Sequence, residues 1–237
     1  MKEATLEYRE RPAAAGAHSG ARTVTVVLLH GFGADADDLI PLADLFDPQR
    51  AHRWLFPQAP YRVSLFGPRS RAWFPRTEAE IEAAATGAYF QRLRERDPES
   101  LREAGREVAE FCRDLELAPE TTVLGGFSQG SVVALEATLG DGFRPAALAV
   151  MSGALIAERR WRRQLPASVA EIPVLQSHGT VDEILAYNEA VALSELLTES
   201  GARVEFQRFE GGHSIPAELA GPFTRLLEKP VGGRSNA

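Results

Sequence analysis

The chain has 237 residues, 44% hydrophobic and 25% charged, and this composition excludes disordered, collagen-like and coiled-coil proteins. Its 26 basic and 33 acidic residues give a net charge of -7, which disfavours binding to nucleic acid or to an anionic membrane. The single cysteine, Cys112, excludes an internal disulfide and a cysteine-rich zinc site. The sequence shows no signal-peptide pattern and no bilayer-length apolar run, so we expect a cytoplasmic protein without stable membrane insertion.

Short apolar runs alternate with helical patterns along the chain, which is typical of a mostly parallel sheet with helices on both faces. The runs that we expect to be strands are residues 23–29, 54–56, 121–124, 146–151, 173–176 and 204–206, after a first strand near the N-terminus. The expected helices are a short one capped by Asp37 or Asp38, one opened by Thr77 and Glu80, one opened by Asp97 and Pro98, and residues 129–139, 184–200 and 215–228. The sequence therefore predicts an α/β fold, with residues 1–237 as one domain.

Three segments fall outside this alternation. Residues 12–20 are small and polar and predict a surface loop, residues 58–76 predict a long proline-containing loop, and residues 229–237 predict a flexible tail. The arginine-rich stretch 159–163, around Trp161, is interpreted as a surface loop after a strand.

A candidate nucleophile lies directly after the apolar run 121–124. The segment Gly126-Phe127-Ser128-Gln129-Gly130 matches G-x-S-x-G and stands between an expected strand and an expected helix. This strand–turn–helix context is the one in which a serine on a strained turn is exposed as a nucleophile. A glycine-rich turn with an incidental serine is the alternative interpretation.

A serine hydroxyl needs a base, and the base needs an acid that orients it. After Ser128 the chain has two histidines, His178 and His213. We expect Asp182 as the acid and His213 as the base, because each follows a different predicted strand and the order Ser, Asp, His is that of α/β-hydrolases. His178 is a weaker candidate for the base because it precedes the acid and ends a strand, and Glu183 is the alternative acid.

The glycine-containing turn His30-Gly31-Phe32-Gly33 follows the first long strand. We expect the backbone N–H of Phe32 and that of Gln129 to form the oxyanion hole. His30 is expected to hold this loop rather than to titrate during catalysis.

Several segments carry a family resemblance, and they occur in the family's order between residues 28 and 213. They are residues 28–35 (LLHGFGAD), 57–60 (PQAP), 73–74 (WF), 125–130 (GGFSQG), 176–179 (QSHG) with Asp182, and 211–213 (GGH). On these residues the sequence resembles the α/β-hydrolase carboxylesterase/phospholipase family, which includes the acyl-protein thioesterases. The resemblance implies an α/β-hydrolase fold, a Ser128, Asp182 and His213 triad, and an oxyanion hole at Phe32 and Gln129.

The chain departs from the family pattern in three places. Ser131 stands where a glycine often follows the motif, and Glu183 and Ala186 stand where relatives often have prolines. Residues 76–98 are longer than the family minimum and are a candidate for a small lid, although the motifs leave no room for a large cap domain.

The expected activity is hydrolysis of carboxylic esters of short to medium acyl chains, without cofactor or metal. The alternatives are a lysophospholipase or acyl-protein thioesterase, and a non-catalytic binding protein on a hydrolase scaffold. The substrate is expected to be a small-molecule ester or thioester, and a homodimer is a candidate assembly. The side chains predicted to bind substrate are Phe66, Trp73, Phe74 and Ile184.

The loop 58–76 contains four arginines and no acidic residue. Those arginines are Arg62, Arg69, Arg71 and Arg76. They predict either attraction of an anionic substrate, such as a lysophospholipid head group or a carboxylate ester, or a solvated loop paired with Glu78, Glu80 and Glu82.

Overall fold

The computed structural model describes residues 6–14, 23–64, 67–76, 93–140 and 142–228. Its centre is a seven-stranded sheet in the order β1-β3-β2-β6-β7-β8-β9, in which β1 is antiparallel to β3 and the other pairs are parallel. The strands are β1 (Tyr8–Arg11), β2 (Thr25–Leu29), β3 (Arg53–Pro57), β6 (Thr122–Phe127), β7 (Ala147–Met151), β8 (Pro173–Gly179) and β9 (Arg203–Phe209).

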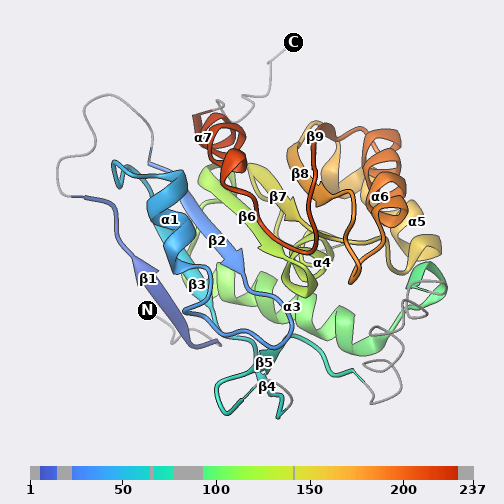
Figure 1. Ribbon diagram of the computed structural model, residues 1–237, viewed down its shortest axis with the longest axis horizontal. Helices are drawn as coiled ribbons and strands as arrows, with labels where there is room; N and C mark the ends of the chain where they lie inside the picture. Colours follow the sequence, from blue (N-terminus) through green and yellow to red (C-terminus); the bar gives the residue numbers. More distant parts are fainter. Residues whose placement is uncertain (1–5, 15–22, 65–66, 77–92, 141, 229–237) are drawn as a thin grey trace.

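Helices cover both faces of this sheet (Figure 1). They are α1 (Ile40–Phe46), α3 (Glu99–Asp114), α4 (Gln129–Glu136), α5 (Glu158–Val169), α6 (Tyr187–Glu199) and α7 (Ala220–Glu228), with 3-10 turns η2 (Pro119–Thr121) and η3 (Ala217–Leu219). The arrangement confirms the predicted α/β-hydrolase fold, with a mostly parallel sheet between two helical layers.

The central strand β2 shows why the sheet carries helices on both sides. Val27 and Leu29 point into the apolar cluster beneath α3, α4, α5 and α6, whereas Val26 and Leu28 point into the cluster beneath α1 and α7. Successive side chains of a strand alternate between faces, so the apolar stretch 26–29 is buried on both.

Strands β6, β8 and β9 each run three residues beyond their predicted ends. Their ladders continue because neighbouring strands pair with them, as in Phe127 with Met151 and Gly179 with Phe209. Because these ends contain glycine and polar residues, the apolar pattern stops earlier and predicts shorter strands. One consequence is that His178 lies inside β8.

The arginine-rich stretch 159–163 lies within helix α5, so the predicted surface loop is wrong. Trp161, Leu165 and Val169 recur at helical spacing and are all buried, which is the signal that predicts a helix here. Arg159, Arg162 and Arg163 are exposed, whereas Arg160 pairs with the buried Glu136 at 2.7 Å, and Pro166 lies inside the helix.

The loop 58–76 contains a short antiparallel pair, β4 (Tyr61–Arg62) and β5 (Arg71–Ala72). Helix α1 begins at Ile40 with Leu39 as its N-cap, and α3 begins at Glu99 with Pro98 as its N-cap. Both starts lie after the predicted caps, Asp37 or Asp38 for α1 and Asp97 for α3.

Some predicted features lie outside the described residues. They are Phe66, the Thr77–Glu80 capping pattern, most of the lid segment 76–98, most of the loop 12–20, and the tail 229–237. Within the part of the chain that is described, no helix combines the length and apolarity needed to span a membrane.

Candidate active site

Ser128 lies on the turn between β6 and α4, with φ 53° and ψ -119°. A non-glycine residue rarely adopts a positive φ, so this backbone is strained and must be held by its surroundings. A Cβ at Gly126 would collide with the Gly130 backbone, and one at Gly130 would collide with the Leu29 carbonyl oxygen. Both glycines of the motif are therefore required for the chain to pack at this turn.

The serine after the motif fits the same turn. The Ser131 hydroxyl donates a 2.7 Å hydrogen bond to the Ser128 carbonyl oxygen, and the Ser128 N–H donates to the Met151 carbonyl oxygen at 2.9 Å. The departure from the family's glycine thus adds a bond that holds the nucleophile's own backbone.

The structure brings His213 and Asp182 into contact. Asp182 follows β8 and His213 follows β9, and the Nδ1 atom of His213 lies 2.7 Å from the Oδ2 atom of Asp182. The imidazole ring also packs against Phe127, with ring centroids 4.8 Å apart. Because Phe127 directly precedes Ser128, the base candidate lies beside the turn that carries the nucleophile candidate.

Asp182 is surrounded by hydrogen-bond donors. Its Oδ1 atom accepts the backbone N–H groups of Ile184 and Leu185, each at 2.8 Å. Burial opposes ionisation of the carboxyl, but hydrogen bonds from His178, His213 and Leu185 outweigh it and hold the Asp182 pKa well below its usual range. The carboxylate is therefore charged at neutral pH, as a group that orients an imidazole must be.

His178, the alternative base, is fully buried inside β8. Its Nε2 atom lies 2.7 Å from the Leu185 carbonyl oxygen and 3.2 Å from the Asp182 Oδ2 atom. The shorter contact requires Nε2 to carry the proton that it donates. His178 thus supports the loop that bears Asp182, whereas the His213 side chain is 16% exposed.

The turn His30-Gly31-Phe32-Gly33 runs against the nucleophile turn. A Cβ at Gly31 would lie 3.2 Å from the Phe127 ring and 3.5 Å from the Ser128 Cβ. The Gly33 N–H donates to the Arg71 carbonyl oxygen at 2.8 Å, which ties the turn to the 58–76 segment. This placement suits the predicted contribution of Phe32 to an oxyanion hole.

The Gln129 side chain forms a clamp that the sequence did not reveal. Its Oε1 atom accepts the Trp73 N–H and its Nε2 group donates to the Phe74 carbonyl oxygen, both at 2.9 Å. The Trp73 indole N–H in turn donates to the His30 carbonyl oxygen at 2.8 Å. The clamp therefore joins the two segments that carry the predicted oxyanion donors.

His30 stays neutral in this network. Its Nδ1 atom lies 2.8 Å from the Gly31 carbonyl oxygen, and its Nε2 atom accepts the Ala59 N–H at 3.2 Å. Burial lowers the pKa of His30 to about 4, against an ordinary value of 6.5. These contacts agree with the expectation that His30 holds the loop.

The predicted substrate-binding side chains differ in their surroundings. Trp73 is fully buried, Phe74 is buried but lines a cavity, and Ile184 is 41% exposed.

Among the described residues, no group of three His, Cys, Asp or Glu side chains is placed to hold a metal. Cys112 is buried, which raises the pKa of its thiol to about 12 and keeps it protonated.

The mostly parallel sheet, with its serine on a strained strand-to-helix turn, places the protein in the α/β-hydrolase class. The model of the phospholipase/carboxylesterase family matches residues 13–224, and the chain belongs to that family. This membership confirms the resemblance in the sequence and identifies the chain as a hydrolase.

Similar proteins include carboxylesterases and thioesterases. The chain is 31% identical over 215 residues to a probable carboxylesterase SOBER1-like of Arabidopsis thaliana, covering 84% of this chain and 76% of that one. It is 28% identical over 220 residues to acyl-protein thioesterase 1 of Schizosaccharomyces pombe, covering 90% and 94%. Among solved structures, esterase PE8 superposes with a TM-score of 0.71 at 28% identity, covering 94% of this chain and 97% of that one.

Proposed function

We propose that this protein is a serine carboxylesterase in which Ser128 is the nucleophile, His213 the base and Asp182 the acid. The observation that carries the proposal is the 2.7 Å contact between His213 Nδ1 and Asp182 Oδ2, beside a strained serine. That contact makes Nδ1 the protonated nitrogen and leaves the Nε2 lone pair to accept a proton.

The reaction has two halves. His213 Nε2 takes the Ser128 hydroxyl proton as Oγ bonds to the ester carbonyl carbon, and the imidazolium then returns the proton to the departing alkoxide or thiolate. A water molecule attacks the resulting acyl-serine by the same route, releasing the acid and restoring the hydroxyl. Asp182 stays ionised throughout and stabilises the imidazolium.

The oxyanion that forms in each half is proposed to rest on the backbone N–H groups of Phe32 and Gln129. A lost donor of this kind typically costs about 3–4 kcal/mol of transition-state stabilisation. The clamp from Gln129 to Trp73 and Phe74 supports this assignment, because it holds one donor segment against the other.

Two other activities follow from the relatives. Similarity to acyl-protein thioesterase 1 over 90% of the chain favours a thioesterase as the alternative to hydrolysis of short and medium esters, and the phospholipase/carboxylesterase family favours a lysophospholipase. A non-catalytic binding protein is disfavoured, because Ser128, Asp182 and His213 are all retained. The cytoplasmic location and the homodimer stay predictions.

A panel of p-nitrophenyl esters of increasing acyl length, with matched thioesters, tests the proposal. We expect the highest kcat/KM for short to medium esters and loss of all turnover in Ser128→Ala. A preference for long acyl thioesters would favour the thioesterase alternative. Full turnover by folded Ser128→Ala would overturn the mechanism.

A further inference from the structure

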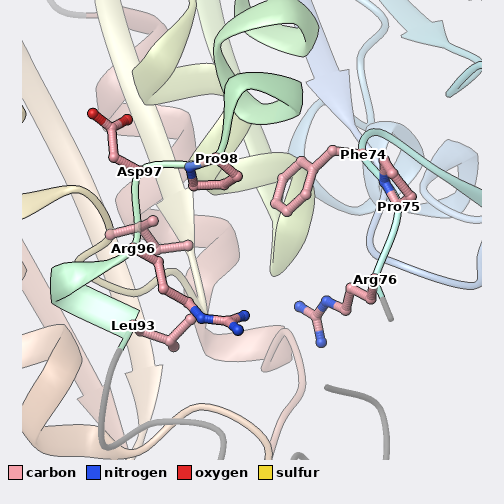
Figure 2. Close-up of a pocket in the computed structure, with 8 residues that line it drawn as sticks. Phe74, Pro75, Arg76, Leu93, Arg96, Asp97 and Pro98 are labelled. Atoms are coloured by element: carbon pink, nitrogen blue, oxygen red, sulfur yellow. The ribbon is translucent and has the colours of Figure 1, made fainter. Parts of the chain in front are cut away.

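A cavity of about 310 Å³ adjoins the candidate active site and plays no part in the mechanism above. Figure 2 shows how two segments line it, one around Phe74 and the other before α3. The lining residues are Phe74, Pro75, Arg76, Leu93, Arg96, Asp97, Pro98 and Ile156. A volume of this size suits a small organic group.

Two contacts connect the cavity to the candidate oxyanion hole. The Phe74 carbonyl oxygen accepts the Gln129 side-chain amide at 2.9 Å. The Arg76 guanidinium carbon lies 5.0 Å from the centroid of the Phe32 ring, within the range of a cation–π contact. Phe32 and Gln129 carry the proposed oxyanion donors, so these contacts place the cavity beside the proposed site.

The cavity combines positive charge with apolar walls. The guanidinium groups of Arg76 and Arg96 face the same space from its two sides in Figure 2. The nearby Asp97 carboxylate points away from them there and pairs with Arg102 at 2.7 Å and Arg160 at 2.9 Å. A ligand that enters thus meets two guanidinium groups beside buried aromatic and aliphatic side chains.

The other arginines of the 58–76 segment are placed differently. Arg62, Arg69 and Arg71 line a different cavity, together with Asp35 and Asp37. Arg76 lines the cavity beside the proposed site. The sequence-based hypothesis of an anion-attracting loop therefore narrows to Arg76, joined by Arg96 from a distant part of the chain.

We propose that this cavity is a subsite for the carboxylate of an anionic ester, a half-ester of a dicarboxylic acid. Guanidinium groups bind carboxylates through paired, charge-assisted hydrogen bonds, and the apolar wall accommodates the chain between the carboxylate and the scissile ester. This inference rests on the proposed esterase function and names its preferred substrate class.

The test compares monoethyl adipate with ethyl hexanoate, which has a methyl group where the adipate has its carboxylate. Ethanol release gives kcat/KM for both. We expect the wild type to prefer the adipate, and Arg76→Met and Arg96→Met each to lower the adipate-to-hexanoate ratio by about 3- to 10-fold. Arg76→Lys keeps the charge and should retain part of the preference.

Arg225→Met is the matched control, because it removes an exposed arginine of α7 that pairs with Glu205. Its ratio should equal that of the wild type. An unchanged ratio in both Arg76→Met and Arg96→Met would overturn the subsite, as would a wild type that prefers the hexanoate. Should Arg76→Met not fold, Arg96→Met and Arg76→Lys still decide the question. Failure of the esterase proposal is distinguishable, because the wild type would then hydrolyse neither ester, or Ser128→Ala would retain ethyl hexanoate turnover.

Discussion

The Nδ1 atom of His213 lies 2.7 Å from the Oδ2 atom of Asp182, although 31 residues separate them in the chain. Strands β8 and β9 are parallel neighbours, so the loops that follow them meet at one edge of the sheet. Ser128 follows β6 at the same edge. The chemistry proposed for the site depends on this alignment of strand ends.

His213→Ala should abolish esterase activity, whereas His178→Gln should not. Loss of the base typically lowers kcat on the order of 10⁴-fold or more. Gln at position 178 can still donate to the Leu185 carbonyl oxygen, which His178 contacts at 2.7 Å, so we expect less than about a tenfold loss with an unchanged pH profile. Steady-state kinetics across pH measure both. If His178→Gln were as inactive as His213→Ala, the result would contradict the assignment of His213 rather than His178 as the base.

Gln129→Leu should lower kcat more than it raises KM. The substitution leaves the buried Trp73 N–H and Phe74 carbonyl without the bonds that Gln129 provides, and loosens the proposed oxyanion donors. We expect kcat to fall about 10- to 100-fold. Gln129→Glu is the matched variant: it keeps an acceptor for Trp73 but sets a carboxylate oxygen against the Phe74 carbonyl, so we expect a loss of kcat at least as large. Wild-type kcat in folded Gln129→Leu would show that the clamp does not position the site.

Burial of neutral His30 should make stability depend on acidity. Its pKa is lowered from 6.5 to about 4, so the unfolded chain binds a proton first as pH falls. The contribution of neutral His30 to the free energy of unfolding is complete above pH 6.5 and is lost between pH 6.5 and about 4. At roughly 1.4 kcal/mol per pKa unit, this contribution amounts to about 3 kcal/mol. Urea unfolding of wild type and His30→Gln at pH 7 and pH 4 measures it. Parallel losses in both proteins would contradict this account.

Asp47→Asn should destabilise the fold. The buried carboxylate accepts hydrogen bonds from Arg11 at 3.0 Å and the Trp54 indole at 3.1 Å. Burial opposes its charge, but these bonds and backbone N–H donors lower the Asp47 pKa, so its contribution holds above the ordinary carboxyl pKa and fades below it. Breaking the pair of Arg11 and Asp47 should lower the free energy of unfolding by about 3 kcal/mol at pH 7, as urea unfolding would measure.

Asp44→Asn is the control for that variant. Asp44 also bonds Arg11, at 3.0 Å, but its side chain is 71% exposed. We therefore expect the free energy of unfolding to fall by less than about 1 kcal/mol. Equal losses in the two variants at pH 7 would argue against a special role for the buried pair.

The sheet and the three proposed catalytic residues could be predicted from sequence because their signals are local. Apolar runs mark the strands, and Ser128, Asp182 and His213 each follow one of them. Strand ends rich in glycine, such as that of β6, were predicted too short because their pairing depends on neighbouring strands.

Other features depend on contacts between distant segments and leave no local pattern. The Gln129 clamp on Trp73 spans 56 residues, and the cavity joins Arg76 to Arg96. Helix α5 was missed because its arginines and Pro166 obscure the spacing of the buried Trp161 and Leu165.

Labelling with a fluorophosphonate, followed by peptide mass analysis, tests the central proposal most directly. We expect one adduct on Ser128 in the wild type, none in Ser128→Ala, and strongly slowed labelling in His213→Ala. An adduct on another residue, or labelling of folded Ser128→Ala at the wild-type rate, would contradict the assignment of Ser128 as the nucleophile.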